Sequence, residues 1–149
     1  MKTVPENVTD GFRKIFADHA ELSDLIMKKN GLNVELNELM EMAKAGNDGA
    51  NGLPSVWLRN FTYALQQEME ELTESIAWKW WKPSVRTDLA NVRVEIVDIF
   101  HFLISAAQAS GMDADTFAEI YYKKRALNFH RQNIEFKEGD NEAHGIGNL

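Results

Sequence analysis

The segment NVRVEIVDIFHFLISAA, residues 91–107, decides the fold class of this protein. Nearly every position in it is apolar, so a helix of this composition must bury at least one face in a core. Glu95 and Asp98 interrupt the segment three residues apart and therefore fall on the same helix face. Burying an unpaired carboxylate is costly, so the sequence predicts that another group compensates both charges.

A second pair of carboxylates has the same spacing. Glu68 and Glu71 lie three residues apart in EMEE, on a helix face that also carries the apolar residues Leu65 and Leu72. If the two helices pack antiparallel, all four carboxylates converge on one spot. Such a cluster repels itself unless hard divalent cations are present, and all-oxygen coordination is what Mg²⁺ or Mn²⁺ prefers. Ions held in this way usually bind substrate phosphates as well.

Helix start and stop signals predict five helices and no strand. The first helix is capped by Thr9 or Asp10 and ends near Asn30-Gly31, and a short second helix is capped by Asn33 and ends at Gly46. The third helix runs from about Ser55 to Pro83. The fourth helix is opened by Thr87 or Asp88 and closed by Gly111, and the fifth is capped by Asp113 and runs from about Ala114 to Arg131. We therefore expect an all-α chain, with a single-domain helical bundle over residues 1–132 and a polar, flexible tail over residues 133–149.

Composition excludes several classes of function. The chain of 149 residues has no cysteine, which excludes disulfides, thiolate metal sites and cysteine nucleophiles and favours a cytoplasmic location. Its net charge of −7 argues against binding a nucleic-acid polymer, although not against a single nucleotide. The longest apolar stretch, residues 99–107, is too short to span a bilayer, and MKTVPENVTD lacks the apolar core of a secretory signal.

Three other readings of the carboxylates remain open at this stage. The acidic run 68–74 can be a solvated helix face, and Glu95 and Asp98 can form buried salt bridges, for example with Arg93. Asp98 and His101 can also suggest a di-iron carboxylate site, but such sites need a Glu-x-x-His on each of two helices and the helix of EMEE offers no histidine. His101 is then a hydrogen-bonded histidine, either of the core or beside the residues that bind the metal.

Together these residues resemble a known superfamily. The order E-x-x-E followed by E-x-x-D resembles the metal motif of the all-α nucleoside triphosphate pyrophosphatases, which include MazG and the dimeric dUTPases. Within that superfamily, SIAWKWWK (75–82), NVRVEIVDIFHF (91–102) and YYKKRALNFHRQ (121–132) resemble the dimeric dUTPase branch, including the phage-type dCTP/dUTP pyrophosphatases.

The resemblance implies roles for individual residues. Glu68, Glu71, Glu95 and Asp98 would hold Mg²⁺, for which Mn²⁺ can substitute, between protein and triphosphate. The substrate-binding residues would be Trp78 and Lys79 near the nucleotide, Lys124, Arg125, Asn128, Arg131 and Lys137 in the C-terminal segment, and His19 and Ser23 at the base. Arg125 stands where the family usually has asparagine, and His19 and Ser23 stand nearest to a usual glutamine and asparagine, so base preference is open.

The expected activity is Mg²⁺-dependent hydrolysis of a pyrimidine deoxynucleoside triphosphate, foremost dUTP, to the monophosphate and pyrophosphate, a step of nucleotide-pool sanitation. A dCTP-specific or broader MazG-like pyrophosphohydrolase is the alternative. Glu68, ahead of Glu71, is the expected general base. The resemblance also implies a homodimer or a related tetramer. A helical-bundle interaction module with salt-bridged carboxylates is the non-enzymatic alternative, which would bind no Mg²⁺.

Overall fold

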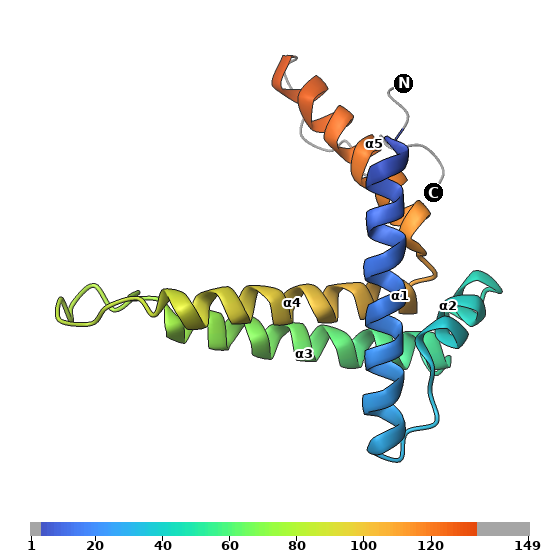
Figure 1. The fold of residues 1–149 in the computed structure, drawn as a ribbon, viewed down its shortest axis with the longest axis horizontal. Helices are drawn as coiled ribbons and strands as arrows, with labels where there is room; N and C mark the ends of the chain where they lie inside the picture. The colour runs from blue at the N-terminus through green and yellow to red at the C-terminus, as the bar shows by residue number, and fades with distance from the viewer. Residues whose placement is uncertain (1–3, 134–149) are drawn as a thin grey trace. The chain divides into compact units, whose positions relative to one another are not determined.

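The computed structural model describes residues 4–133, and all regular secondary structure in that range is helical. The five helices are α1 (Glu6–Lys29), α2 (Leu36–Lys44), α3 (Leu53–Ser75), α4 (Leu89–Ala109) and α5 (Ala114–Asn133) (Figure 1). The prediction of an all-α chain with five helices is confirmed for the described part of the chain. The tail predicted over residues 133–149 lies outside the described residues from residue 134 onward.

The described chain forms two compact units. The larger unit, Asp18–Gly111, contains the second half of α1 and all of α2, α3 and α4. In it, α3 and α4 pack against each other and run antiparallel, and α2 packs against both (Figure 1). The antiparallel arrangement is the one that convergence of the two carboxylate pairs requires.

Apolar residues from all four helical segments form the core of the larger unit. Leu36 and Leu39, three apart on α2, are completely buried, which is worth about 1.5–3 kcal/mol for each side chain. The buried cluster around them also contains Ala20, Met27, Phe61 and Ala109. This core fixes α3 and α4 relative to each other at one end of the pair.

The smaller unit joins the start of α1 to α5. The ring of Phe117 lies 5.7 Å from that of Phe12 and 5.8 Å from that of Phe16, centroid to centroid. Arg13 donates two hydrogen bonds to the carboxylate of Asp115, of 2.8 and 2.9 Å. An aromatic contact and a bidentate ion pair therefore connect the two helices of this unit.

The helix ends confirm some sequence predictions and correct others. Asp88 caps α4, Asp113 accepts a hydrogen bond from the backbone N–H of Thr116 at the start of α5, and Gly111 follows α4 with a φ of 85°. Asn33 was the wrong cap for α2, because the backbone N–H of Leu36 instead donates to the Asp24 carboxylate on α1.

The start of α1 also differs from the prediction. The helix begins at Glu6, directly after Pro5, and not at Thr9 or Asp10. Pro5 lacks an N–H and has a fixed φ, so it fits the edge of a helix, and its carbonyl accepts from the backbone N–H groups of Val8 and Thr9.

The end of α3 differs most from the prediction. The helix stops at Ser75 and not at Pro83, so the WKWWK segment lies in a loop. Two hydrogen bonds close this loop: the N–H of Ala77 donates to the Thr87 hydroxyl, and the N–H of Asp88 donates to the Ser75 carbonyl. Partners ten or more residues away along the chain thus replace the helical bonds that would have continued α3.

Candidate active site

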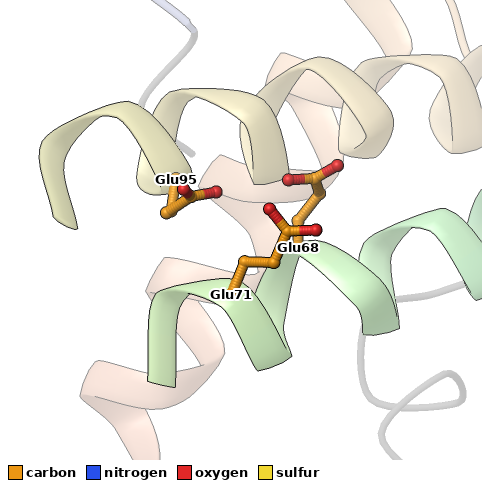
Figure 2. A group of neighbouring side chains, drawn as sticks. All are labelled: Glu68, Glu71 and Glu95. Carbon is orange, nitrogen blue, oxygen red and sulfur yellow. The ribbon is translucent and has the colours of Figure 1, made fainter. Parts of the chain in front are cut away.

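Three carboxylates meet between the two antiparallel helices. Glu68 and Glu71 project from α3 and Glu95 projects from α4, and one oxygen of each lies within 4.8 Å of the others. Figure 2 shows the three side chains turned toward one another. The spacing of three residues places Glu68 and Glu71 on the same face of α3, and helix packing then brings Glu95 opposite them.

Glu95 is the most deeply placed member of the cluster, with 6% of its surface exposed. Its side chain accepts a hydrogen bond of 2.9 Å from the Asn91 amide. Within residues 4–133 no lysine or arginine pairs with Glu95, so the salt bridge with Arg93 considered from sequence finds no support. The compensation of its charge must come from elsewhere.

The pKa of Glu68 reflects the repulsion among the clustered carboxylates. Burial raises the pKa of Glu68 above its usual value, and the negative charges of Glu71, Asp98 and Glu95 raise it further. Loss of the Glu68 proton is less favourable here, because no positive charge among the described residues pairs with the cluster to offset the repulsion. A divalent cation would supply that charge, and the all-oxygen donor set suits Mg²⁺ or Mn²⁺.

Asp98 lies one turn beyond Glu95 on α4 but outside the tight group of three. Its Oδ1 is 3.9 Å from Nδ1 of His101, and its charge acts on Glu68. The ring centroid of His101 also lies 5.5 Å from that of His19. The expected role of Asp98 as the fourth ligand stays a prediction.

Further along α4, toward its C-terminus, Ser105 forms a polar contact with His19 of α1. Nε2 of His19 lies 2.8 Å from the hydroxyl of Ser105, whereas Nδ1 of His19 is buried and has no hydrogen-bond partner. Burial lowers the pKa of His19, and proximity to His101 lowers it further. Ser23, the other expected base contact, is partly buried on α1.

Ser105 and Gln108 are residues of this region that the sequence patterns did not single out. Only 2% of the surface of Ser105 and 3% of that of Gln108 is exposed. The Gln108 amide donates to Asn37 over 3.5 Å, and its own oxygen is buried without a partner. A signal was present, because polar residues at 91, 95, 98, 101, 105 and 108 recur at helical spacing on a helix that is otherwise apolar.

The loop after α3 carries two of the expected substrate-binding residues. Nζ of Lys79 lies 4.9 Å from the ring centroid of Trp78 and 3.5 Å from a carboxylate oxygen of Glu74. Lys79 thus contacts two side chains of the protein itself. The expected contact of Trp78 and Lys79 with a nucleotide stays a prediction. Trp80, with 85% of its surface exposed, contacts Trp81 edge to face.

The expected phosphate-binding residues belong to α5 in the smaller unit. The Arg125 guanidinium lies over the ring of Phe129 at 4.7 Å, and Asn128 is exposed. Lys124 and Arg131 are partly buried, and each has an interaction partner. Lys137 lies outside the described residues. The roles of all five in binding phosphate stay predictions.

An all-helical chain with a carboxylate cluster suited to divalent cations is the class that fold and site define. Comparison with known proteins gives the family. A family model described as dUTPase matches residues 12–113, more than half of the chain. The chain belongs to this dUTPase family, as the resemblance in its motifs predicted.

Two relatives are named dCTP pyrophosphatase. The protein of Enterobacteria phage T4 is 27% identical over 109 residues, which cover 70% of this chain and 56% of the relative. The protein of Enterobacteria phage LZ5 is 30% identical over 100 residues, which cover 51% of this chain and 58% of the relative. The chain therefore spans somewhat more than half the length of these relatives. No solved structure matches it.

The described helices do not include a membrane-spanning segment, since none of them is both long enough and apolar enough to cross a bilayer.

Proposed function

We propose that the protein is a Mg²⁺-dependent pyrophosphohydrolase of pyrimidine deoxynucleoside triphosphates, with dUTP as the foremost substrate. The observation that carries the proposal is the cluster of Glu68, Glu71 and Glu95, whose carboxylates lie within 4.8 Å of one another between two packed helices. Membership of the dUTPase family and similarity to two dCTP pyrophosphatases support the same chemistry.

The cluster residues would divide the work of hydrolysis. Glu68, Glu71, Glu95 and Asp98 would hold Mg²⁺, which when bound would neutralise phosphate charge and acidify a water molecule. Glu68, as a carboxylate not fully used in metal binding, would also accept the proton of the attacking water, with Glu71 as the alternative base. The water would attack the triphosphate in line, and the products would be the monophosphate and pyrophosphate without a covalent intermediate.

The basic residues of the C-terminal segment would bind the phosphates. Arg131 and Arg125 offer planar guanidinium groups that pair with phosphate oxygens in a bidentate manner, and Lys124 and Lys137 add point charges. Asn128 would contact the substrate with its side-chain amide. Trp78 and Lys79 would approach the nucleotide from the loop after α3.

The base would lie at the neutral end of the polar side of α4. Ser105 can donate its hydroxyl proton to the His101 carbonyl, 3.4 Å away, and accept one from Nε2 of His19, which leaves Nδ1 of His19 as an acceptor. An acceptor suits the N3–H of uracil and the N4 amino group of cytosine alike. Ser23 would contribute a second, adaptable hydroxyl.

A dCTP pyrophosphohydrolase is the second candidate, and the printed names of both phage relatives favour it. The acceptor at His19 does not by itself discriminate between the two bases, because each presents a donor. A broader, MazG-like range of substrates is the remaining alternative. The preference between uracil and cytosine is therefore to be measured by comparing kcat/KM for dUTP and dCTP under identical conditions.

The test is pyrophosphate release from dUTP, dCTP, dTTP, dATP, dGTP and UTP in Mg²⁺ and in excess chelator. Glu71→Gln should abolish turnover, whereas Glu70→Gln, the same change at an exposed neighbouring position, should leave it intact. A purine triphosphate as the best substrate would overturn the pyrimidine assignment. Absence of both Mg²⁺ binding and hydrolysis would favour the interaction-module alternative.

We also propose that the protein is a homodimer, with a tetramer as the related alternative. Several apolar side chains on α4 are about half exposed: Leu89, Val94, Ile96, Val97 and Leu103. A face of this kind on a helix whose other side packs against α3 suits burial against a second copy. Light scattering coupled to size exclusion tests this, and a monomer at micromolar concentration would contradict it.

A further inference from the structure

The side chain of Asn91 connects the two helices that carry the cluster. Its amide nitrogen donates 2.9 Å to Oε1 of Glu95, one turn further along α4, and 2.7 Å to Oγ of Ser75 at the end of α3. An amide nitrogen has two hydrogens, so both are used. The orientation of the amide follows from this, because turning it over would set its oxygen against the acceptor oxygen of the Glu95 carboxylate.

Ser75 continues the connection into α3. Its hydroxyl donates to the backbone carbonyl of Glu71 over 3.0 Å while it accepts from Asn91. The result is a chain of hydrogen bonds from the side chain of Glu95, through Asn91 and Ser75, to the backbone of Glu71. One carboxylate on α4 and the helical turn that bears a carboxylate on α3 are thereby held in register.

The backbone on both sides of this chain is fixed independently. The Asp88 carboxylate accepts from the backbone N–H groups of Ala90 and Asn91, each at 3.1 Å. The N–H of Asp88 in turn donates 2.9 Å to the carbonyl of Ser75. Asn91 therefore starts from an anchored position in the first turn of α4, so its side chain can restrict the rotamer of Glu95.

We propose that Asn91 is a positioning residue of the cation site, acting through Glu95 with Ser75 as its support. The inference rests on the proposed function, in which the cluster binds a divalent cation. A ligand carboxylate held by a donor from its own helix loses less conformational freedom when the cation binds.

The test is Mn²⁺ affinity without nucleotide, measured from the electron paramagnetic resonance signal of free Mn²⁺ in titrations of the full chain. Asn91→Ala, Asn91→Leu and Ser75→Ala should each weaken affinity by about 10- to 100-fold, the range found when partners of metal ligands are removed. Ser75→Thr keeps the hydroxyl and should retain an affinity close to that of the wild type. Asn60→Ala, at an exposed position of α3, is the matched control.

The outcomes separate this inference from the proposed function. Wild-type protein that binds no Mn²⁺ would overturn both. Wild-type binding with affinities within twofold for Asn91→Ala, Asn91→Leu and Ser75→Ala would overturn the role of Asn91 alone. Circular dichroism confirms that each variant is folded, and if the Asn91 variants do not fold, Ser75→Ala against Ser75→Thr decides the question.

Discussion

The two halves of α4 handle buried polarity in opposite ways. Toward its N-terminus, Glu95 faces Glu68 and Glu71, three acids with no basic partner among the described residues. Toward its C-terminus, Ser105 and Gln108 are equally buried, but they are neutral and bonded to His19 and Asn37. One helix thus carries a charged end and a neutral end about three turns apart.

This difference indicates which kind of ligand each end can accept. Like charges that are held together without a counterion favour a cation from solution, and in the proposed function a polyphosphate would arrive with such cations. A neutral end at which Nδ1 of His19 and Oε1 of Gln108 have no hydrogen-bond partner suits an uncharged hydrogen-bonding group such as a nucleobase. A nucleoside triphosphate has both parts, so substitutions at the two ends of α4 should affect catalysis in different ways.

The largest expected effect is at the charged end. Glu95→Gln removes a charge that the proposed cation needs while it keeps the size of the side chain. We expect kcat/KM for dUTP to fall by more than ~100-fold, beyond the range typical of residues that only support a metal ligand. Steady-state kinetics at saturating Mg²⁺ measure this, with Glu70→Gln as control, and activity close to wild type would refute the metal site.

Stabilisation by the cation is the next largest expected effect. A cation that binds only the native state raises the free energy of unfolding by about 2.7 kcal/mol at roughly 100 times its Kd. The melting temperature should therefore rise with Mg²⁺ or Mn²⁺ concentration in the wild type but not in Glu95→Gln. Equal rises in both proteins would show that the cation binds at another place.

A smaller effect is expected at the neutral end. Ser105→Ala removes the partner of Nε2 of His19 and frees the imidazole to change tautomer. One hydrogen bond is worth about 1 kcal/mol, so we expect up to ~10-fold change in the ratio of kcat/KM for dUTP to that for dCTP. Mn²⁺ affinity should be unchanged. A change in Mn²⁺ affinity with a constant substrate ratio would contradict the division between the ends.

The smallest effect concerns pH in the absence of metal. Since the pKa of Glu68 is raised in the folded protein, its contribution to stability is present below the ordinary pKa of a glutamate and is lost as pH rises through the raised value. Glu68→Gln should therefore gain stability relative to wild type over that pH range. Urea unfolding at a series of pH values measures this, and a pH-independent difference would contradict it.

The lowered pKa of His19 predicts the opposite slope at the neutral end. Its contribution to stability is present above the ordinary pKa of a histidine and is lost as pH falls through the lowered value. Titration of Glu68 thus lowers the stability of the protein as pH rises, whereas titration of His19 lowers it as pH falls.

Features that depend on nearby residues were predictable from the amino-acid sequence. The periodicity of residues 91–107 required a buried helix, and the spacing of Glu68 from Glu71 placed both on one face of another. Asp88, Asp113 and Gly111 marked helix ends correctly, because caps act within one turn of the residue that supplies them. The motifs also indicated the family correctly.

Features that depend on residues distant along the chain follow from the packing of the helices and were not predictable from local patterns. The end of α3 at Ser75 is set by bonds to Thr87 and Asp88, and the start of α2 is capped by Asp24 from another helix. The pairing of His19 with Ser105, 86 residues away, follows from packing in the same way. A pattern within one helix carries no record of its partner, because which side chains meet is settled by how the apolar faces pack.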